Sequence, residues 1–471
     1  MTSRETSAQV LRNRRFAVLF LAALLVLTLS WLLRPRHHDE VTSTGSPLGP
    51  SVSASTSAPS GPSSAQTRLA KATRIAGKIT PKSITAASTG VVLAANMMYG
   101  HNVTLYAADG TAQAAIADGV DAARLGASGP TGTVRGAPVE AVFTADGQYA
   151  YVTNYAMYGA GLPPEPSETC TPADQVAPSY VYRIDLTKRV VDQVMKVGGL
   201  PKSLAITPDG RSVVVANWCS WDLSVIDTAQ GKPVATVRLD KYPLGLSVSP
   251  DSRTVYVGLS GVNKLVTVDL GSVAGGVTQA QDFAKTDADP RDVAISPDGR
   301  YLYVVHNEAG TVTKLDSSSG AVVAQAKTNG QPRSLVVSPD GSAVYVANYA
   351  TSTLVKLRGS DLGLIEEVKT DVHPVGVTYE PTKKRVWVAC YSGSIVVFDD
   401  STVPGPAPVS PSSSSPPPAS APASSAPAAT STPTASATPR PPASSATSQP
   451  SSPKAAASAA QTPTRATATT H

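Results

Sequence analysis

The chain has 471 residues, of which 41% are apolar and only 15% are charged, and its formal net charge is +5. This positive charge lies at the two ends. Residues 1–40 and 401–471 carry +3 each, which leaves −1 for residues 41–400. A nucleic-acid-binding surface needs clustered Lys and Arg to neutralise phosphates. We therefore expect no nucleic-acid partner.

The first predicted element is a helix that crosses a membrane. Residues 16–33, FAVLFLAALLVLTLSWLL, form an uncharged run of 18 residues, about the shortest length that spans a bilayer. Arginines are more numerous before the run than after it, which favours a cytoplasmic location for residues 1–15. The alternative is a cleaved signal peptide, but the run is long for one and no A-x-A motif follows closely. We predict a single-pass bacterial membrane protein whose remaining chain is extracytoplasmic.

Two segments have the composition of disordered chain. Residues 34–70 are predicted to be a linker because Ser, Thr, Gly and Pro dominate most of them. Residues 401–471 consist almost entirely of Ser, Thr, Ala and Pro and contain no acidic residue. Such segments cannot bury enough apolar surface to offset the entropy of ordering. We predict that the folded part is confined to residues 71–400.

Within that part, one hairpin sequence recurs. Pro-Asp-Gly closes a turn because proline fixes φ, aspartate bonds its own backbone and glycine accepts positive φ. The flanking residues alternate between apolar and polar, as in half-buried strands. A weaker seventh copy occupies residues 83–97. The six clear copies are VFTADGQYAYVTN (142–154), AITPDGRSVVVAN (205–217), SVSPDSRTVYVGL (247–259), AISPDGRYLYVVH (294–306), VVSPDGSAVYVAN (336–348) and TYEPTKKRVWVAC (378–390).

The spacing of the copies predicts an all-β fold. Each hairpin is followed by two further strand-like segments, and units of about 40 to 45 residues with four strands are typical of β-propeller blades. A proline opens every unit, and seven such prolines are present. The last unit supplies only three strands, whereas residues 73–80 stand alone before the first. We predict a seven-bladed β-propeller with four-stranded blades, closed by pairing of residues 73–80 with the last blade.

The repeats resemble the YVTN-repeat family of seven-bladed propellers, which is lactonase-like or of surface-layer type. YVTN stands at 151–154, YVAN at 345–348, and S-P-D-G at 296–299 and 338–341. The resemblance implies an extracytoplasmic bacterial propeller that acts either as a binding protein or, as in some lactonase-like relatives, as a hydrolase. Two units depart from the motif, since Leu259 and Cys390 replace its asparagine.

Basic residues follow the opening proline in several units. These are Lys82, Lys202, Arg291 and Arg333, with Glu140 as the exception. Near the channel rim they would form a ring that attracts carboxylate or phosphate. The alternative is that they pair with neighbouring acids or are solvated. Four further residues end or follow second strands and are also candidates for ligand binding at the rim: Asn154, Asn217, His306 and Asn348. The asparagines could equally cap turns.

The longest predicted loop is an insert at residues 155–179 in the second unit. Long loops without secondary structure are uncommon in compact domains and are often functional. Cys170 in this insert and Cys219 in the next unit are predicted on the same face, outside the cytoplasm, where disulfides persist. We predict that they pair and that Cys390 stays a buried free thiol. Aromatic residues on these loops suit contacts with a protein or glycan, although they could instead pack between blades: Tyr155, Trp218, Trp221, Tyr349 and Tyr391.

No catalytic residue and no cofactor is predicted. The histidines are scattered without the short spacings of metal sites, and no C-x-x-C-H haem motif is present. The leading hypothesis is a membrane-anchored, non-catalytic binding or scaffolding module for a protein or cell-envelope component. The alternatives are a lactonase-like hydrolase at the channel mouth, or a spacer whose tail makes the interactions.

Overall fold

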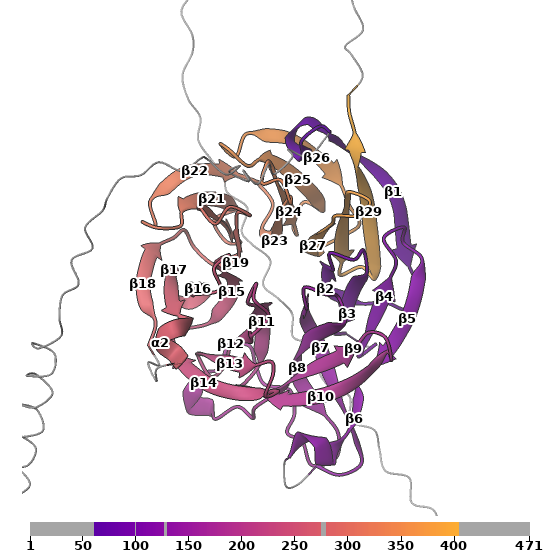
Figure 1. Cartoon of the computed structure of the whole chain (residues 1–471), viewed down its shortest axis with the longest axis vertical. Coiled ribbons are helices and arrows are strands. Elements are labelled where there is room, and N and C mark those ends of the chain that lie inside the picture. Colours follow the sequence, from indigo (N-terminus) through magenta and orange to yellow (C-terminus); the bar gives the residue numbers. More distant parts are fainter. Residues whose placement is uncertain (1–60, 99, 127–129, 275–278, 405–471) are drawn as a thin grey trace, which may run out of the picture. The chain divides into compact units, whose positions relative to one another are not determined.

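The described part of the chain is a propeller. The computed structural model describes residues 61–404, apart from residues 99, 127–129 and 275–278. Seven antiparallel sheets are arranged in a ring around a central channel (Figure 1). The predicted anchor at residues 16–33, most of the linker and the tail from residue 405 lie outside the described residues. Within residues 61–404, no described helix is long and apolar enough to cross a membrane.

Apart from the short strand β6 of blade 2, which pairs with β7 at the outside of the ring, the strands of each blade follow one another from the channel outwards (Figure 1). Blade 1 contains β2 (Pro81–Ala86), β3 (Val92–Asn96), β4 (Asn102–Tyr106) and β5 (Ala112–Ala117). Blade 2 contains β6 (Gly119–Asp121), β7 (Thr133–Phe143), β8 (Tyr149–Tyr158), β9 (Tyr180–Asp185) and β10 (Val190–Lys196). Blade 3 contains β11 (Pro201–Ile206), β12 (Ser212–Asn217), β13 (Asp222–Asp227) and β14 (Lys232–Arg238).

The remaining blades repeat this order. Blade 4 contains β15 (Pro243–Val248), β16 (Thr254–Leu259), β17 (Lys264–Asp269) and β18 (Gln281–Lys285). Blade 5 contains β19 (Pro290–Ile295), β20 (Tyr301–His306), β21 (Thr311–Asp316) and β22 (Val322–Lys327). Blade 6 contains β23 (Pro332–Val337), β24 (Ala343–Asn348), β25 (Thr353–Arg358) and β26 (Leu364–Lys369). Blade 7 contains β27 (Pro374–Glu380), β28 (Arg385–Cys390), β29 (Ser394–Thr402) and β1 (Arg68–Ala76).

Short helical segments connect some of these strands. The described helical segments are η1 (Ser64–Gln66), η2 (Ala122–Leu125), η3 (Pro172–Asp174), η4 (Ser260–Val262) and α2 (Leu270–Ala274). The described domain is therefore all-β with seven blades, as predicted. Blade 2 departs from the predicted four strands because the short strand β6 pairs with the N-terminal part of the long strand β7.

The recurring hairpin turns hold themselves by one hydrogen-bond pattern. In blade 3, the Thr207 hydroxyl donates to Asp209 Oδ1 at 2.6 Å, and the same oxygen accepts the Arg211 N–H at 3.1 Å. Gly210 between them has φ +71°, a left-handed conformation that glycine adopts without steric cost. Ser296 and Asp298 repeat the hydroxyl–carboxylate contact in blade 5. The turn chemistry read from Pro-Asp-Gly is thus confirmed.

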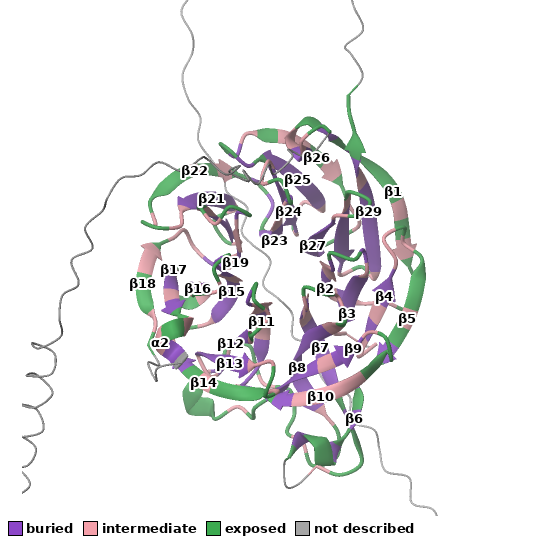
Figure 2. Ribbon diagram, in the orientation of Figure 1, coloured by how far each residue is buried: buried purple, intermediate pink, exposed green. Residues whose placement is uncertain are grey.

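The apolar core lies between neighbouring blades (Figure 2). One buried cluster joins Val214 and Leu223 of blade 3 to Val257 and Val266 of blade 4. Blades 1 and 7 share another cluster, centred on the fully buried Trp387. Because each sheet buries its faces against the sheets on either side, only a complete ring covers every blade.

The N-terminal strand closes the ring, as predicted, but from an earlier residue. β1 pairs with β29 from Arg68 to Ala76, rather than from residue 73 to residue 80. The predicted boundary at residue 71 therefore falls inside a strand. The Thr67 hydroxyl lies 3.1 Å from Asp400 Oδ1, and both residues are buried. The segment before residue 71 has a linker-like composition, and only its pairing with β29 reveals it as part of the fold.

Candidate functional site

A cavity of about 250 Å³ lies in the central channel and is lined by the first strand of all seven blades. Lys82, Lys202, Arg291 and Arg333, the four predicted basic residues, all line it. Two acidic residues, Glu140 and Asp292, line the same cavity. The structure therefore brings the predicted basic ring together around one space.

A β-bulge explains why consecutive residues line the cavity. In every blade, the pairing between the first and second strands shifts by one residue just after the opening proline. The extra residue re-aims the side chains beside it, and both Arg291 and Asp292 reach the channel. Glu140 is the second residue after Pro138, so it corresponds to Asp292 and is not an exception among the bases. Val139 takes the position of the bases and is buried.

The two acidic residues of the cavity, Asp292 and Glu140, both have a raised pKa. The Asp292 carboxylate accepts the N–H groups of Val293 at 2.9 Å and Leu335 at 3.0 Å, which ties β19 to β23. Burial nevertheless raises its pKa to about 6. Burial also raises the pKa of Glu140 to about 7, although the nearby Lys82 acts in the opposite direction. Near neutral pH, Glu140 is therefore part protonated, as a group able to accept or donate a proton would be.

Two of the bases have partners of their own. The Lys202 ammonium lies 3.0 Å from Glu168 Oε1 and 3.8 Å from the centre of the Trp218 ring. Arg291 is 3.9 Å from Asp289, at the limit of an ion pair. Burial is the main cause that lowers the pKa of Lys202 to about 8. Glu168 was not predicted from the sequence, because it reaches the channel only through the fold of the insert.

The other two bases, Arg333 and Lys82, have fewer polar partners. Arg333 stacks over the Tyr349 ring at 4.1 Å, and its buried Nε has no hydrogen-bond partner within the described residues. Lys82 makes no ion pair or side-chain hydrogen bond in the same part of the chain. Burial is the main cause that lowers the pKa of Lys82, to about 8, and of Arg333, and the positive charge of Arg291 adds to it.

The predicted asparagines and His306 do not line this cavity. All three asparagines are fully buried: Asn217 and Asn348 end their strands, whereas Asn154 lies inside strand β8. The Asn217 amide donates to Asp222 at 2.6 Å and to Ser224 at 2.9 Å, while the amides of Asn154 and Asn348 donate to backbone carbonyls. We expected these residues at the channel rim, but each amide nitrogen donates within the fold, and each amide oxygen is buried without a hydrogen-bond partner among the described residues.

His306 lies in strand β20 and not in a loop. Its ring is fully buried, with Nδ1 3.3 Å from the Thr311 hydroxyl. Burial lowers its pKa, so the ring is neutral at physiological pH. A ring that is sealed inside a blade cannot contact a ligand at the channel rim.

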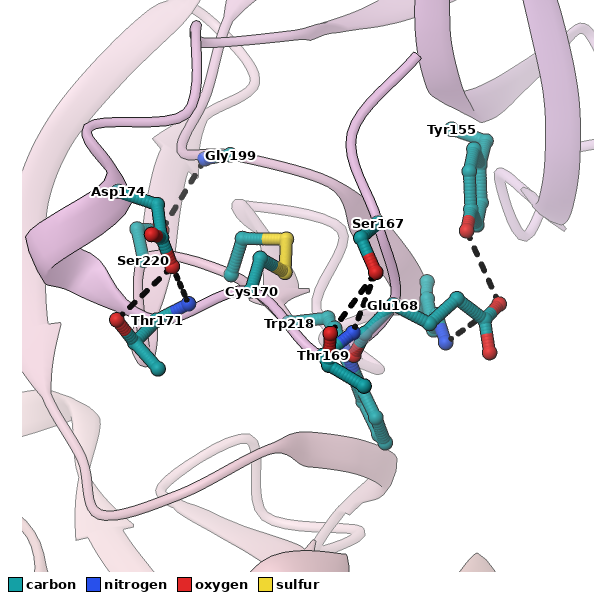
Figure 3. Close-up of a disulfide and its surroundings, with 12 residues drawn as sticks. Tyr155, Ser167, Glu168, Thr169, Cys170, Thr171, Asp174, Gly199, Trp218 and Ser220 are labelled. Atoms are coloured by element: carbon teal, nitrogen blue, oxygen red, sulfur yellow. Dashed lines mark hydrogen bonds and ion pairs between the residues drawn. A yellow bond between two sulfur atoms is a disulfide. The ribbon is translucent and has the colours of Figure 1, made fainter.

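The insert is fixed over blade 3 by a disulfide between Cys170 and Cys219 (Figure 3), which confirms the predicted pair. Their Cα atoms are 5.2 Å apart. Trp218 Nε1 donates to the Glu168 carbonyl at 2.8 Å, and the Tyr155 hydroxyl donates to the Glu168 carboxylate at 3.0 Å. With the ion pair between Lys202 and Glu168, four contacts thus hold Glu168 and its neighbours in place.

Tyr155 differs from its prediction. It was expected on an exposed loop, but strand β8 continues to Tyr158 and Tyr155 is buried. A second cavity, of about 490 Å³, lies beneath the insert. Apolar side chains predominate in its lining, which includes Tyr155, Met157, Leu162, Pro163 and Leu200.

Aromatic residues form two clusters on this face. Trp218 stacks on Tyr242 with ring centres 4.5 Å apart, and Trp221 meets Tyr242 edge-on at 5.7 Å. In the second cluster, Tyr349 stacks on His373 at 4.3 Å and meets Tyr391 edge-on. Tyr242 was missed in the sequence, although its place directly before an opening proline was a usable signal. The loops of blades 3 and 4, and of blades 6 and 7, thus share their aromatic side chains.

The loops of this face are also joined by backbone hydrogen bonds. In five blades the residue before the opening proline has φ between 48° and 58°. Its carbonyl accepts the N–H of the residue that follows the second strand. The pairs are Leu200 with Trp218, Tyr242 with Ser260, Asp289 with Asn307, Gln331 with Tyr349, and His373 with Tyr391. The face is therefore a rigid surface rather than a set of independent loops.

Thiol or metal chemistry within the described residues would need the free cysteine or a cluster of possible metal ligands. Cys390 is a buried free thiol, as predicted, and burial raises its pKa to about 12. A nucleophilic cysteine needs a lowered pKa and access to substrate. Among the described residues, no group of three or more His, Cys, Asp or Glu side chains could hold a metal ion.

Comparison with known families agrees with the fold. Residues 220–324 match the family described as "Lactonase, 7-bladed beta-propeller", and residues 291–396 match the family described as "Cytochrome D1 heme domain". The first match and the seven observed blades confirm the predicted resemblance to lactonase-like propellers. Within residues 291–396, His306 is sealed in its blade and His373 stacks on Tyr349, and neither lines the channel cavity. The cavity therefore does not fit a haem with a histidine ligand.

Individual relatives are distant. Hydrazine synthase subunit beta of Kuenenia stuttgartiensis is 25% identical over 153 residues, which is 24% of this chain. The chain thus spans only 40% of the curated relative that it matches. The solved structure of Kuenenia stuttgartiensis hydrazine synthase matches with a TM-score of 0.53 at 21% identity, over 69% of this chain and 96% of that chain. A chain of the mitotic checkpoint complex matches with a TM-score of 0.55 at 14% identity, over 78% and 99%.

Proposed function

We propose that this lactonase-type seven-bladed propeller is a non-catalytic binding module, anchored to a bacterial membrane by residues 16–33 and displayed outside the cytoplasm. Its binding surface is the loop face that carries the insert, Trp218, Trp221 and Tyr242. The partner is a protein of the cell envelope. The similarity to hydrazine synthase subunit beta, which is one subunit of an enzyme, supports a role in an assembly.

The fixed insert is the observation that carries this proposal. The disulfide between Cys170 and Cys219 holds the insert beside the aromatic cluster, and Glu168 locks the insert to Tyr155 and Trp218. A loop that is already ordered loses little entropy on binding. Large amphipathic aromatics at a rigid surface are typical hot-spot residues of protein interfaces. Pre-organisation of this kind suits the recognition of a partner.

The proposal is tested with the intact chain in membranes. A photo-crosslinking residue replaces Trp221, and crosslinked partners are compared with those of a chain that carries the probe at Val322, an exposed residue of the outer strand β22. We expect one defined protein at position 221 and none at position 322. Truncation of Trp218 to Ala should abolish the adduct. Equal amounts of adduct at both positions would refute the proposal that the loop face is the binding surface. Loss of the adduct on deletion of residues 401–471 would show that the tail recognises the partner.

Lactone hydrolysis in the channel is a second candidate function. The family match supports it, and so does Glu140, whose pKa of about 7 suits a general base. Lys82 would stabilise the developing negative charge. Hydrolysis of a lactone panel by the purified chain, lost on Glu140→Gln, would favour this function. If the purified chain hydrolysed none of the lactones, this second function would be rejected, and the proposal of a binding module would still stand.

A further inference from the structure

The channel cavity holds more positive than negative charge. Four basic and two acidic side chains line it, which leaves a formal charge of +2. One of the acids, Asp292, already accepts two backbone N–H groups. The positive side chains act on one another, since Arg291, Lys202 and Arg333 all lower the pKa of Lys82. A buried cluster of like charge is costly unless a counter-charge enters it.

Structural pairing accounts for Lys202, which contacts Glu168, but not fully for the other three bases. Arg333 Nε is buried and unpartnered within the described chain, and Lys82 has no side-chain hydrogen bond there. Arg291 has only the contact of 3.9 Å with Asp289. By contrast, the buried Lys314 in blade 5 donates to two backbone carbonyls, at 2.9 and 3.0 Å. The same fold therefore satisfies a buried lysine where its role is structural.

One carboxylate already reaches into this positive region from outside. The side chain of Glu168 is 64% exposed, yet its carboxylate contacts Lys202, which is only 12% exposed. Glu168 comes from the insert and not from a channel strand. The contact between this carboxylate and Lys202 shows that the mouth of the channel can bind a carboxylate group.

We infer that the channel binds a compact oxyanion with two negative charges, held by Lys82, Arg291 and Arg333, while Glu168 competes for Lys202. Guanidinium groups bind carboxylate and phosphate oxygens in a bidentate manner, and the cavity of about 250 Å³ is below the usual size for drug-sized ligands. This site adjoins the aromatic loop face, because Lys202 lies over the Trp218 ring and Arg333 over the Tyr349 ring. Its ligand is a small anion and does not depend on the proposed protein partner.

Sulfate is the first probe, because it keeps both charges across the pH range of the test. Calorimetric titration uses the full-length chain in detergent at constant ionic strength. We expect saturable binding that strengthens as the pH falls from 9 to 6. Lys82 and Lys202, with pKa values of about 8, become charged, while Glu140 and Asp292 lose charge. Phosphate and succinate then show whether the site prefers phosphate or carboxylate ligands.

Variants separate the site from general charge effects. Arg333→Met should weaken sulfate binding about ten-fold or more, because it removes a charge-assisted contact, whereas Arg333→Lys should retain part of the affinity. Glu168→Gln should strengthen binding about three-fold by removing the competing charge. Arg211→Gln, at an exposed turn, is the matched control and should change nothing. Absence of saturable binding, or equal binding by Arg333→Met and the parent, would overturn the inference.

Discussion

Two sets of basic side chains in this propeller, one fully buried and one half-buried, behave in opposite ways. Lys356, where the ring closes, is fully buried against the equally buried Asp400, and it also donates to the carbonyl and hydroxyl of Thr67 at 3.0 and 3.1 Å. Arg333, in the channel, leaves Nε without a partner in the described chain. The closing lysine has an oxygen for each of its three protons.

The difference separates a structural charge from one that is available to a ligand. The Lys356 ammonium joins three distant parts of the chain, because Thr67 precedes β1, Lys356 lies in β25 and Asp400 lies in β29. The Tyr345 hydroxyl also donates to Asp400. The channel bases come from the same repeat but face a space instead of a neighbouring blade. Burial and hydrogen bonding therefore both distinguish the two roles: Lys356 is fully buried and has three acceptors, whereas the channel bases are half-buried and have fewer partners.

The largest effect is expected at the closing pair. Asp400→Asn should lower the free energy of unfolding by about 3 to 5 kcal/mol, since it leaves the charge of Lys356 buried and unpaired. Denaturant unfolding of the purified chain measures this loss. Asp361→Asn is the control, because Asp361 forms an exposed pair with Arg358 and should cost at most about 1 kcal/mol. Equal losses in both variants would contradict the structural role of the closing pair.

Loss of the insert disulfide should have the next largest effect. The double variant Cys170→Ser/Cys219→Ser removes a crosslink across a sequence separation of 49 residues, which should cost about 2 to 4 kcal/mol. Unfolding is compared with and without reductant. Reductant should destabilise the parent and leave the double variant unchanged. An undiminished stability in the double variant would show that the hydrogen bonds of Glu168 alone hold the insert.

Asp118 is a buried acidic residue whose carboxylate has no hydrogen-bond partner within the described residues. It is 3% exposed, and burial raises its pKa from 3.8 to about 7. The folded state therefore holds a proton that the unfolded state releases between about pH 4 and 7, and stability falls as the pH rises through that window. Asp118→Asn should be about 2 kcal/mol more stable than the parent at pH 8 and equal to it at pH 4. A difference independent of pH would show that Asp118 does not titrate as described.

The smallest effect on stability is expected in the channel. Arg333→Met should leave the free energy of unfolding unchanged or raise it by up to about 1 kcal/mol, because it removes an unpaired cation near Lys82 and Arg291. Denaturant unfolding measures the free energy of unfolding of this variant, in the same experiment as that of Asp400→Asn. A loss as large as that of Asp400→Asn would mean that Arg333 is structural, and the distinction between the two sets of bases would fail.

Sequence patterns were sufficient for the ring and for its crosslink. The seven opening prolines and the Pro-Asp-Gly turns predicted the blades, because turn chemistry and strand alternation act over a few residues. The lone strand before blade 1 predicted the closure, although its start was placed too late. The pairing of Cys170 with Cys219 followed from their places on adjacent blades. These features depend on repetition along the chain.

Other parts of the site could not be predicted in this way. Asn217 and Asn348 were candidates for the channel rim, and the structure turns their amides into the blades. Glu168 had no motif, yet it reaches Lys202 through the disulfide-bound insert. Asp292 and Glu140 line the channel because a bulge changes the direction of side chains after the proline, and a bulge leaves no clear mark in a single sequence.

The sequence by itself determined the number of blades, the order of the strands and the positions of the four channel bases, since each depends on local periodicity and turn chemistry. Only the tertiary structure decided which charged side chains find ion-pair and hydrogen-bond partners. Lys356 meets Asp400 and Thr67, residues far from it along the chain, whereas Lys82 and Arg333 meet a cavity. The free energy of a buried charge depends on its surroundings in space, and those surroundings exist only once the ring has closed.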